Sequence, residues 1–189
     1  MRVQLTPPTT ADLAEHLAKQ HKVAHNYTEI GATQATFPEH YYCHRNRYYL
    51  GQGEACWAAA KQALDQWEQF APGWARVYPK EKPKPGLSVV VWFNIFGLWW
   101  KNSARVVYTR DEDNHYGFAY GTLPDHIAKG EEYFGVERDA DGNCHFVLEA
   151  FCQPVFWGVR LFESLMRREQ RRFVEDAGKQ MQAFTAKMV

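Results

Sequence analysis

The chain has 189 residues, 46% of them hydrophobic, which is typical of one globular domain. Its 22 basic and 22 acidic residues give a formal net charge of zero, which argues against a dedicated nucleic-acid-binding protein, because such domains are usually basic. No apolar stretch approaches the roughly 20 residues of a membrane span, and the N-terminus lacks the apolar core of a signal peptide. We therefore expect a cytoplasmic protein without a transmembrane segment.

The first 39 residues predict an N-terminal extension of one helix and one loop, which precedes the sheet of a single domain spanning residues 1–189. Within residues 9–25, Thr9 and Asp12 have the spacing of a capping box, which marks the start of a helix. Residues 26–39 contain a glycine and a proline and are expected to form a loop.

The segment from His40 to Gly51 predicts an edge strand. Alternation places His44, Asn46 and Tyr48 on one face and the intervening arginines on the other. A helix follows the Gly51-Gln-Gly53 break, because four apolar residues recur at helical spacing. These are Trp57, Ala60, Leu64 and Trp67. A short strand over 74–78 and a charged, proline-rich turn over 79–86 come next.

Five further strands are expected, over residues 87–95, 104–110, 116–123, 131–138 and 144–152. Residues 97–102 look like a connection, and if Trp99 and Trp100 are exposed there, they can serve as a pocket lid or as a membrane-touching loop. Asp141-Gly142 is a hairpin signal, Pro154 should end the sheet, and helical spacing of apolar residues predicts a final helix over about 156–187.

The segment Gly117–Thr122 indicates how the sheet is used. One face carries Phe118, Tyr120 and Thr122, while the other carries only glycine and alanine. Such a strand suggests a concave face with a close-packed back. The element order then predicts an α+β fold in which a curved antiparallel sheet of about six to seven strands wraps around a long C-terminal helix, with a cavity between them.

Short motifs over most of the chain resemble those of a small family of bacterial and plant proteins with no assigned activity. They are GAT at Gly31–Thr33, LGQG at Leu50–Gly53, RVVY at Arg105–Tyr108, GFAYGTLPDH at Gly117–His126, GEEYF at Gly130–Phe134 and AFCQP at Ala150–Pro154. The element order also resembles the helix-grip fold of START lipid-transfer domains, the birch-pollen allergen group and polyketide cyclases. That resemblance implies a shape but no reaction, because this superfamily contains binders, transporters and enzymes.

Two positions depart from the family pattern. Ala104 stands where the resemblance implies a cysteine, and Cys152 stands where it implies a serine. A mechanism that needs a thiol at position 104 is therefore not expected in this chain.

The residues expected to face the cavity include one carboxylate, Glu132, which shares its strand face with Phe134 and Val136. Such a carboxylate either forms an ion pair, with Arg105 or His126, or takes a raised pKa suited to acid–base chemistry. The catalytic candidates are Glu132, Tyr120 and His126. The candidate ligand-binding residues are His44, Asn46, Tyr48, Trp67, Tyr108, Phe118, Tyr120, Thr122, Glu132 and Phe134.

Metal and cofactor sites are not expected. The four cysteines are isolated and predicted to be free thiols: Cys43, Cys56, Cys144 and Cys152. In a strand, Cys43 points away from His40 and His44, so these three residues would not converge on zinc. The sequence contains no P-loop, GxGxxG, nucleophile elbow or HExxH motif.

Three functions remain open. The aromatic share of 15% favours a binder of a small or medium apolar, aromatic or lipid-like ligand. A cyclase, dehydratase or hydrolase that uses Glu132 with tyrosine or histidine partners is the second possibility. The third is an adaptor that contacts a partner or membrane through the Trp99-Trp100 segment or through four arginines of the last helix, Arg167, Arg168, Arg171 and Arg172, which otherwise form a solvated face. Ligand identity and oligomeric state are not indicated.

Overall fold

The computed structural model describes residues 2–71, 73–155 and 163–189. The helices are α1 (Thr10–Gln20), η1 (Ala32–Gln34), α2 (Gly53–Asp65), η2 (Glu68–Phe70) and α4 (Glu163–Met188). The strands are β1 (Arg2–Gln4), β2 (Tyr42–Gln52), β3 (Ala75–Tyr78), β4 (Ser88–Ile95), β5 (Leu98–Glu112), β6 (His115–Thr122), β7 (Ala128–Arg138) and β8 (Asn143–Pro154).

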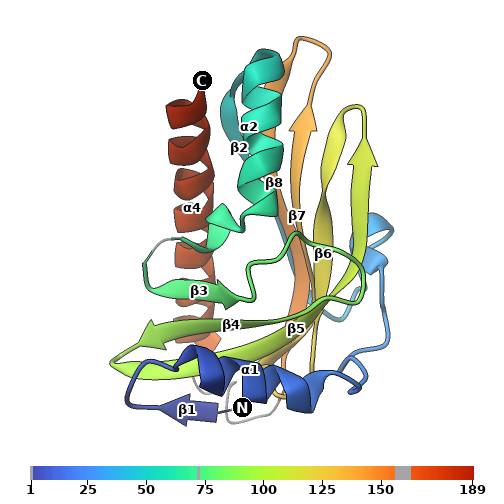
Figure 1. Ribbon diagram of the computed structural model, residues 1–189. Coiled ribbons are helices and arrows are strands. Elements are labelled where there is room, and N and C mark those ends of the chain that lie inside the picture. The colour runs from blue at the N-terminus through green and yellow to red at the C-terminus, as the bar shows by residue number, and fades with distance from the viewer. Residues whose placement is uncertain (1, 72, 156–162) are drawn as a thin grey trace.

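The strands form one antiparallel sheet in the order β2-β8-β7-β6-β5-β4-β3, and the short β1 pairs with the beginning of β5. Figure 1 shows the sheet curling around α2 and α4, with β4 and β5 crossing below the upright strands β6 to β8. β5 is 15 residues long and has a register shift between Val106 and Tyr108. Such a bulge bends a strand, so β5 can pair with the crossing strand β4 and also with the upright strand β6. This arrangement confirms the predicted α+β, helix-grip fold.

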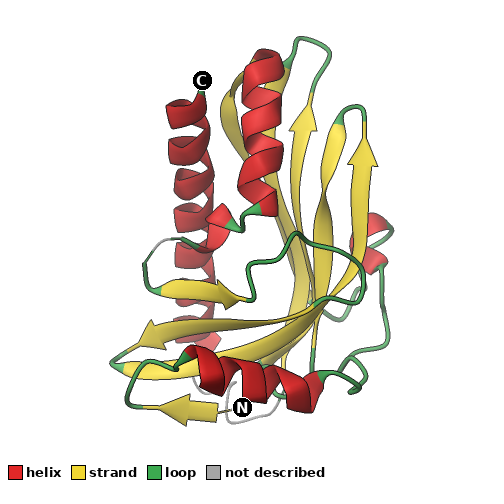
Figure 2. Ribbon diagram, viewed as in Figure 1, coloured by secondary structure: helices red, strands yellow, loops and turns green. Residues whose placement is uncertain are grey.

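The concave side of the sheet holds the main core. Leu64 of α2, Phe70 of η2 and Met181 of α4 are buried against Phe134 and Phe146 of the sheet. After α2 the chain turns sharply at Trp67, whose φ of 59° is left-handed and whose indole is fully buried. The sheet and the two helices therefore share one hydrophobic core. Figure 2 shows both helices on the same side of the curved sheet.

The convex side carries α1. Thr9 and Asp12 form the predicted capping box, and Leu13 of this helix packs on Val90 and Trp92 of β4. The helix ends at Gln20, and the following segment runs along the back of the sheet to β2. The small residues of β6 face this side, which confirms the close-packed back.

One strand boundary was predicted wrongly. β5 begins at Leu98, so Trp99 and Trp100 belong to the strand, and Trp99 packs on Trp92. The connection between β4 and β5 is only Phe96-Gly97, and both residues have positive φ, 54° and 77°. A bulky residue rarely adopts this conformation, so the sequence gives little sign of a tight turn there.

The last helix agrees with its predicted C-terminal part. α4 buries Val174, Ala177 and Met181 at helical spacing. The predicted start at residues 156–162 lies outside the described residues. Within the described ranges, no helix is both long enough and apolar enough to span a membrane.

Candidate functional site

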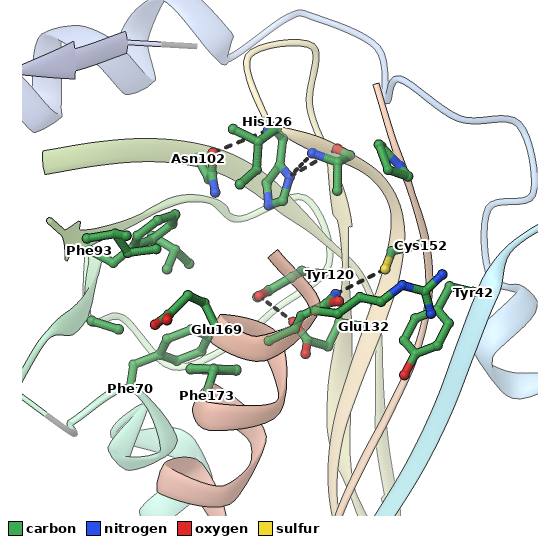
Figure 3. Close-up of a pocket in the computed structure, with 18 of the residues that line it drawn as sticks. Tyr42, Phe70, Phe93, Asn102, Tyr120, His126, Glu132, Cys152, Glu169 and Phe173 are labelled. Carbon is green, nitrogen blue, oxygen red and sulfur yellow. Dashed lines mark hydrogen bonds between the residues drawn. The ribbon is translucent and has the colours of Figure 1, made fainter. Parts of the chain in front are cut away.

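A cavity of about 180 Å³ lies between the first half of α4, strands β3 and β4, and the concave side of β6 to β8. Figure 3 shows Phe70, Phe93 and Phe173 on one side of it and Tyr120, Glu132 and Cys152 on the other. Its apolar wall is largely aromatic: Phe70, Trp74, Val91, Phe93, Ile95 and Phe173. A cavity of roughly 150 Å³ is enough to hold a benzene molecule, so this one has room for a small organic ligand.

Glu132 and Tyr120 form the polar centre of the cavity wall. They face each other on β7 and β6, and the Tyr120 hydroxyl donates a hydrogen bond of 2.7 Å to Glu132 Oε2. Burial raises the pKa of Glu132 to about 7, although the bond from Tyr120 opposes that rise. The predicted ion pair with Arg105 or His126 does not form, and the alternative of a raised pKa holds.

His126 lies in the loop between β6 and β7 and also lines the cavity. Its Nδ1 lies 3.0 Å from both the amide nitrogen and the carbonyl oxygen of Ala128, so either neutral tautomer forms a hydrogen bond with this residue. Burial lowers the pKa of His126 to about 4, so the ring is neutral near pH 7.

Two further polar side chains border the cavity. Asn102 uses its Oδ1 to accept from the Ile127 amide at 3.3 Å, and its Nδ2 points toward the cavity. Glu169 of α4 is only 7% exposed and pairs with Arg168 at 3.3 Å and Arg172 at 3.2 Å. The Glu169 charge is thus already neutralised by two cations, in contrast to Glu132.

Cys152, one of the two positions that depart from the family pattern, lies in the same wall. Its Sγ accepts a 3.0 Å hydrogen bond from Gln170 Nε2. Burial raises the pKa of this thiol to about 11, so it is protonated and weakly nucleophilic. All four cysteines are free, as predicted.

Three predicted ligand-binding residues lie in a second, adjacent hollow. His44, Asn46 and Tyr48 point from β2 toward α4, as strand alternation predicted, and line a groove of about 240 Å³. The Asn46 amide donates a 2.9 Å hydrogen bond to His44 Nδ1. We call this hollow the arginine groove, because Arg167 and Arg171 of α4 form its other side.

Four other predicted site residues are buried outside both hollows. Phe118 is in ring contact with both Trp67 and Phe134 in the centre of the core, and at most 1% of each residue is exposed. Thr122 exchanges hydrogen bonds with the Gly130 backbone, 2.9 Å from its amide, and also bonds Asn26. These side chains shape the scaffold behind the cavity wall.

Tyr108 was expected to share the concave face with Val106, and this orientation is wrong. The register shift between the two residues turns Tyr108 to the convex side, where its hydroxyl lies 2.8 Å from Thr33 Oγ1. Burial raises the pKa of Tyr108 to about 12. A bulge reverses the strand alternation, and nothing in the local sequence announces it.

Arg105 also lies on the convex side and braces the sheet. Its guanidinium donates to the carbonyls of Gln20 at 2.7 Å, His21 at 3.1 Å and Val23 at 2.9 Å, and to Ser88 Oγ. This arginine therefore caps the end of α1 instead of pairing with Glu132.

Glu131, the neighbour of Glu132, is a structural residue that sequence reasoning passed over. It is 2% exposed and accepts hydrogen bonds from the Gly31 amide at 2.7 Å, the Thr33 amide at 3.0 Å and the Tyr27 hydroxyl at 2.8 Å. The Thr33 hydroxyl donates a fourth. The GAT and GEE motifs therefore meet in space, and alternation along β7 would have placed Glu131 on the small-residue face.

A serine, a histidine and an aspartate also meet on the convex side. Both Ser103 Oγ, at 3.1 Å, and Asp125 Oδ2, at 2.5 Å, contact the same nitrogen of His16, its Nε2. A catalytic triad needs the serine and the aspartate on opposite ring nitrogens. This cluster instead fastens α1 to the sheet.

The family model described as "Domain of unknown function (DUF1990)" matches residues 26–180, and the chain belongs to this family. A UPF0548 protein of Deinococcus radiodurans is 35% identical over 180 residues, covering 89% of this chain and 91% of that protein. A UPF0548 protein of Dictyostelium discoideum is 29% identical over 197 residues, covering 92% of this chain and 91% of that protein.

Solved structures with similar folds are much more distant in sequence. A hypothetical protein from Helicobacter pylori superposes with a TM-score of 0.57 at 10% identity, covering 86% of this chain and 96% of that one. A major latex-like protein from Panax ginseng gives 0.50 at 12% identity, covering 76% and 96%. These likenesses support the helix-grip fold alone.

Proposed function

We propose that this member of the family binds a small, mostly apolar molecule in the cavity between the sheet and α4, in the cytoplasm. The observation that carries the proposal is an aromatic cavity of about 180 Å³ whose wall holds a few convergent polar groups. Ligand sites are typically built in this way, with apolar walls for affinity and a few polar groups for orientation.

The polar groups suggest how such a ligand is oriented. Near pH 7 the neutral His126 ring offers its Nε2, and Asn102 offers its Nδ2 as a donor. Glu132, with a pKa of about 7, can donate when protonated or accept when ionised. A ligand with a carbonyl or hydroxyl oxygen on an apolar body would satisfy these groups, whereas a pure hydrocarbon would leave them unpaired.

The test uses 4-phenylbutan-1-ol as a neutral probe, followed by amide chemical shifts and calorimetry. We expect saturable binding, with the shift changes concentrated on residues of the cavity wall such as Ile95 and Ala128. Val91→Phe should abolish binding, because Val91 lines the cavity and the larger ring fills it. Ile30→Phe is the matched control, because Ile30 is 54% exposed outside the cavity.

Equal binding by the wild type and both variants would place the probe elsewhere and contradict the proposal. Absence of binding by a panel of such small aromatic alcohols would do the same. Circular dichroism of Val91→Phe must match that of the wild type, because overpacking a core typically costs about 1–3 kcal/mol.

A second candidate function is supported by the acid–base group itself. A carboxyl with a pKa of about 7, bonded to a tyrosine and lining the same cavity as a neutral histidine, has the properties of a general acid or base. A cyclase, dehydratase or hydrolase could use Glu132 for proton transfer, with Tyr120 or His126 as a hydrogen-bond donor to the reacting oxygen.

If a screen of substrates reveals catalytic activity, this second function predicts how the rate depends on pH. Catalysis by Glu132 as a base should rise through pH 7, and catalysis by Glu132 as an acid should fall there. Glu132→Gln should remove both the inflection and the activity while the fold stays intact. Retained activity in that variant would exclude Glu132 as the proton-transfer residue.

A further inference from the structure

The arginine groove adjoins the cavity, and the two share part of their walls. Tyr42, Arg167 and Gln170 line both hollows. The two hollows are therefore adjacent, and these three side chains lie where they meet. The groove, of about 240 Å³, is lined mainly by polar residues, whereas the cavity is lined mainly by apolar and aromatic ones.

The four arginines of α4 divide into two pairs with different surroundings. Arg168 and Arg172 bind Glu169, and Arg172 also lies 3.8 Å from Asp176. The other two arginines, one helical turn apart, line the groove. Arg168 and Arg172 therefore pair with carboxylates of their own helix, and Arg167 and Arg171 line the hollow.

The groove arginines are positioned for a ligand. The Arg167 guanidinium lies 4.4 Å from the centre of the Tyr42 ring, which orients it across the junction of the two hollows. Arg171 is exposed and forms no ion pair with any residue in the described ranges. The charged residues that line the groove are these two arginines and one carboxylate, Glu175.

The opposite wall adds neutral donors. Because the Asn46 amide donates to His44 Nδ1 at 2.9 Å, the proton of the neutral imidazole belongs on Nε2. Burial lowers the pKa of His44, which keeps the ring neutral near pH 7. The groove thus combines two guanidinium groups with an N–H donor, which suits a carboxylate or a phosphate.

We propose that the ligand is amphipathic, with its apolar body in the cavity and a single anionic end group held by Arg167 and Arg171 in the groove. This inference rests on the proposed function and narrows it to a small apolar carboxylate or phosphate ester. An elongated molecule that occupies both sites would pass the side chains of Tyr42 and Gln170, which border both hollows.

The experiment compares three probes that differ only at one end: 4-phenylbutyrate, 4-phenylbutyl phosphate and 4-phenylbutan-1-ol. Calorimetry on the wild type should show the better anion binding about tenfold or more tightly than the alcohol, as expected for added charged hydrogen bonds. The ratio between carboxylate and phosphate identifies the end group. Raising the salt concentration should weaken the anions and leave the alcohol unchanged.

Substitutions in the groove then test the charge. The variant R171Q, at an arginine that lines the groove but not the cavity, should reduce the anion preference and leave alcohol binding unchanged. Glu175→Gln should act in the opposite direction and tighten the anion about twofold to fivefold, because it removes a negative charge from the groove. Tighter binding of the anion by this variant cannot be caused by unfolding of the protein. Lys179→Gln is the control, since Lys179 is an exposed cation of the same helix.

The outcomes separate the two proposals. If the alcohol and the anions bind equally, or if R171Q weakens all three alike, the anionic end group is excluded while the cavity proposal stands. If none of the probes binds the wild type, both proposals are contradicted. If the anions bind the Val91→Phe variant as tightly as the wild type, they occupy the groove alone, and the amphipathic ligand is excluded.

Discussion

Tyr120 and Glu132 face each other across β6 and β7, and the tyrosine hydroxyl donates a 2.7 Å hydrogen bond to Glu132 Oε2. It is the one hydrogen bond that Glu132 accepts from a residue in the described part of the chain. A carboxylate with so few donors in a poorly hydrated wall is unstable in its charged form, which is why burial raises its pKa to about 7. The pKa of Tyr120 is raised well above its usual value by burial and by this neighbour.

Glu132 should make the stability of the protein depend on pH. Its pKa rises from 4.5 to about 7 on folding, so the folded state holds the proton more tightly. The stabilisation is complete below pH 4.5 and is lost as the pH rises through 7. Glu132→Gln mimics the neutral acid, so it should equal the wild type near pH 4.5 and be more stable at pH 8, by up to about 3 kcal/mol.

Urea unfolding at several pH values measures this difference. Glu137→Gln is the control, because Glu137 is a partly exposed carboxylate of the same strand, with 31% of its side chain accessible. This variant measures the effect of removing a carboxylate from β7 at a position outside the cavity. A Glu132→Gln variant whose stability parallels the wild type at every pH would show that Glu132 titrates normally.

Replacing Glu131 by glutamine should destabilise the protein, whereas the same replacement of Glu132 should stabilise it at high pH. Glu131 accepts hydrogen bonds from Tyr27, Gly31 and Thr33, so Glu131→Gln replaces one accepting oxygen by an amide that repels its donors. We expect a loss of at least about 3 kcal/mol in the free energy of unfolding. Hydrogen exchange should also accelerate over residues 27–33. Protection equal to that of the wild type would contradict the anchoring role.

Gly121 should be intolerant of any side chain. A Cβ at this position would overlap the Tyr27 hydroxyl and approach the His25 ring at 2.8 Å. Gly121→Ala is therefore expected to destabilise the fold by about 1–3 kcal/mol. Tyr27→Phe removes the overlapping oxygen, so the double variant should lose less than the sum of the two single variants. Additive losses in thermal unfolding would exclude this contact as the cause.

Much of the fold could be predicted because continuous strands obey simple alternation. Phe118 and Tyr120, and likewise Glu132 and Phe134, share a face because no bulge interrupts β6 or β7 between them. The capping box at Thr9 and the hairpin turn at Gly142 are local signals, and both are where the sequence predicts them. For Glu132 the sequence left an ion pair and a raised pKa as alternatives, and its apolar neighbours did not decide between them.

The remaining features depend on contacts between distant segments. Tyr108 lies on the convex side because a bulge precedes it in β5. Trp99 belongs to β5 because the left-handed conformation of Phe96 allows a tight turn between β4 and β5. His126 was predicted as a loop residue, but its burial needs β4, β5 and α4 to close around it. The arginine groove likewise joins β2 to α4, which are more than a hundred residues apart in the chain.

The two adjacent carboxylates of β7 have a mechanical consequence. Glu132 faces the cavity, while four hydrogen bonds hold Glu131 to the segment behind the sheet. A guest molecule that drew Glu132 inward would have to drag β7 against all of those bonds. This wall is therefore rigid, and adaptation to guests of different shape falls to the opposite wall, where Phe173 and Arg167 project from the helix.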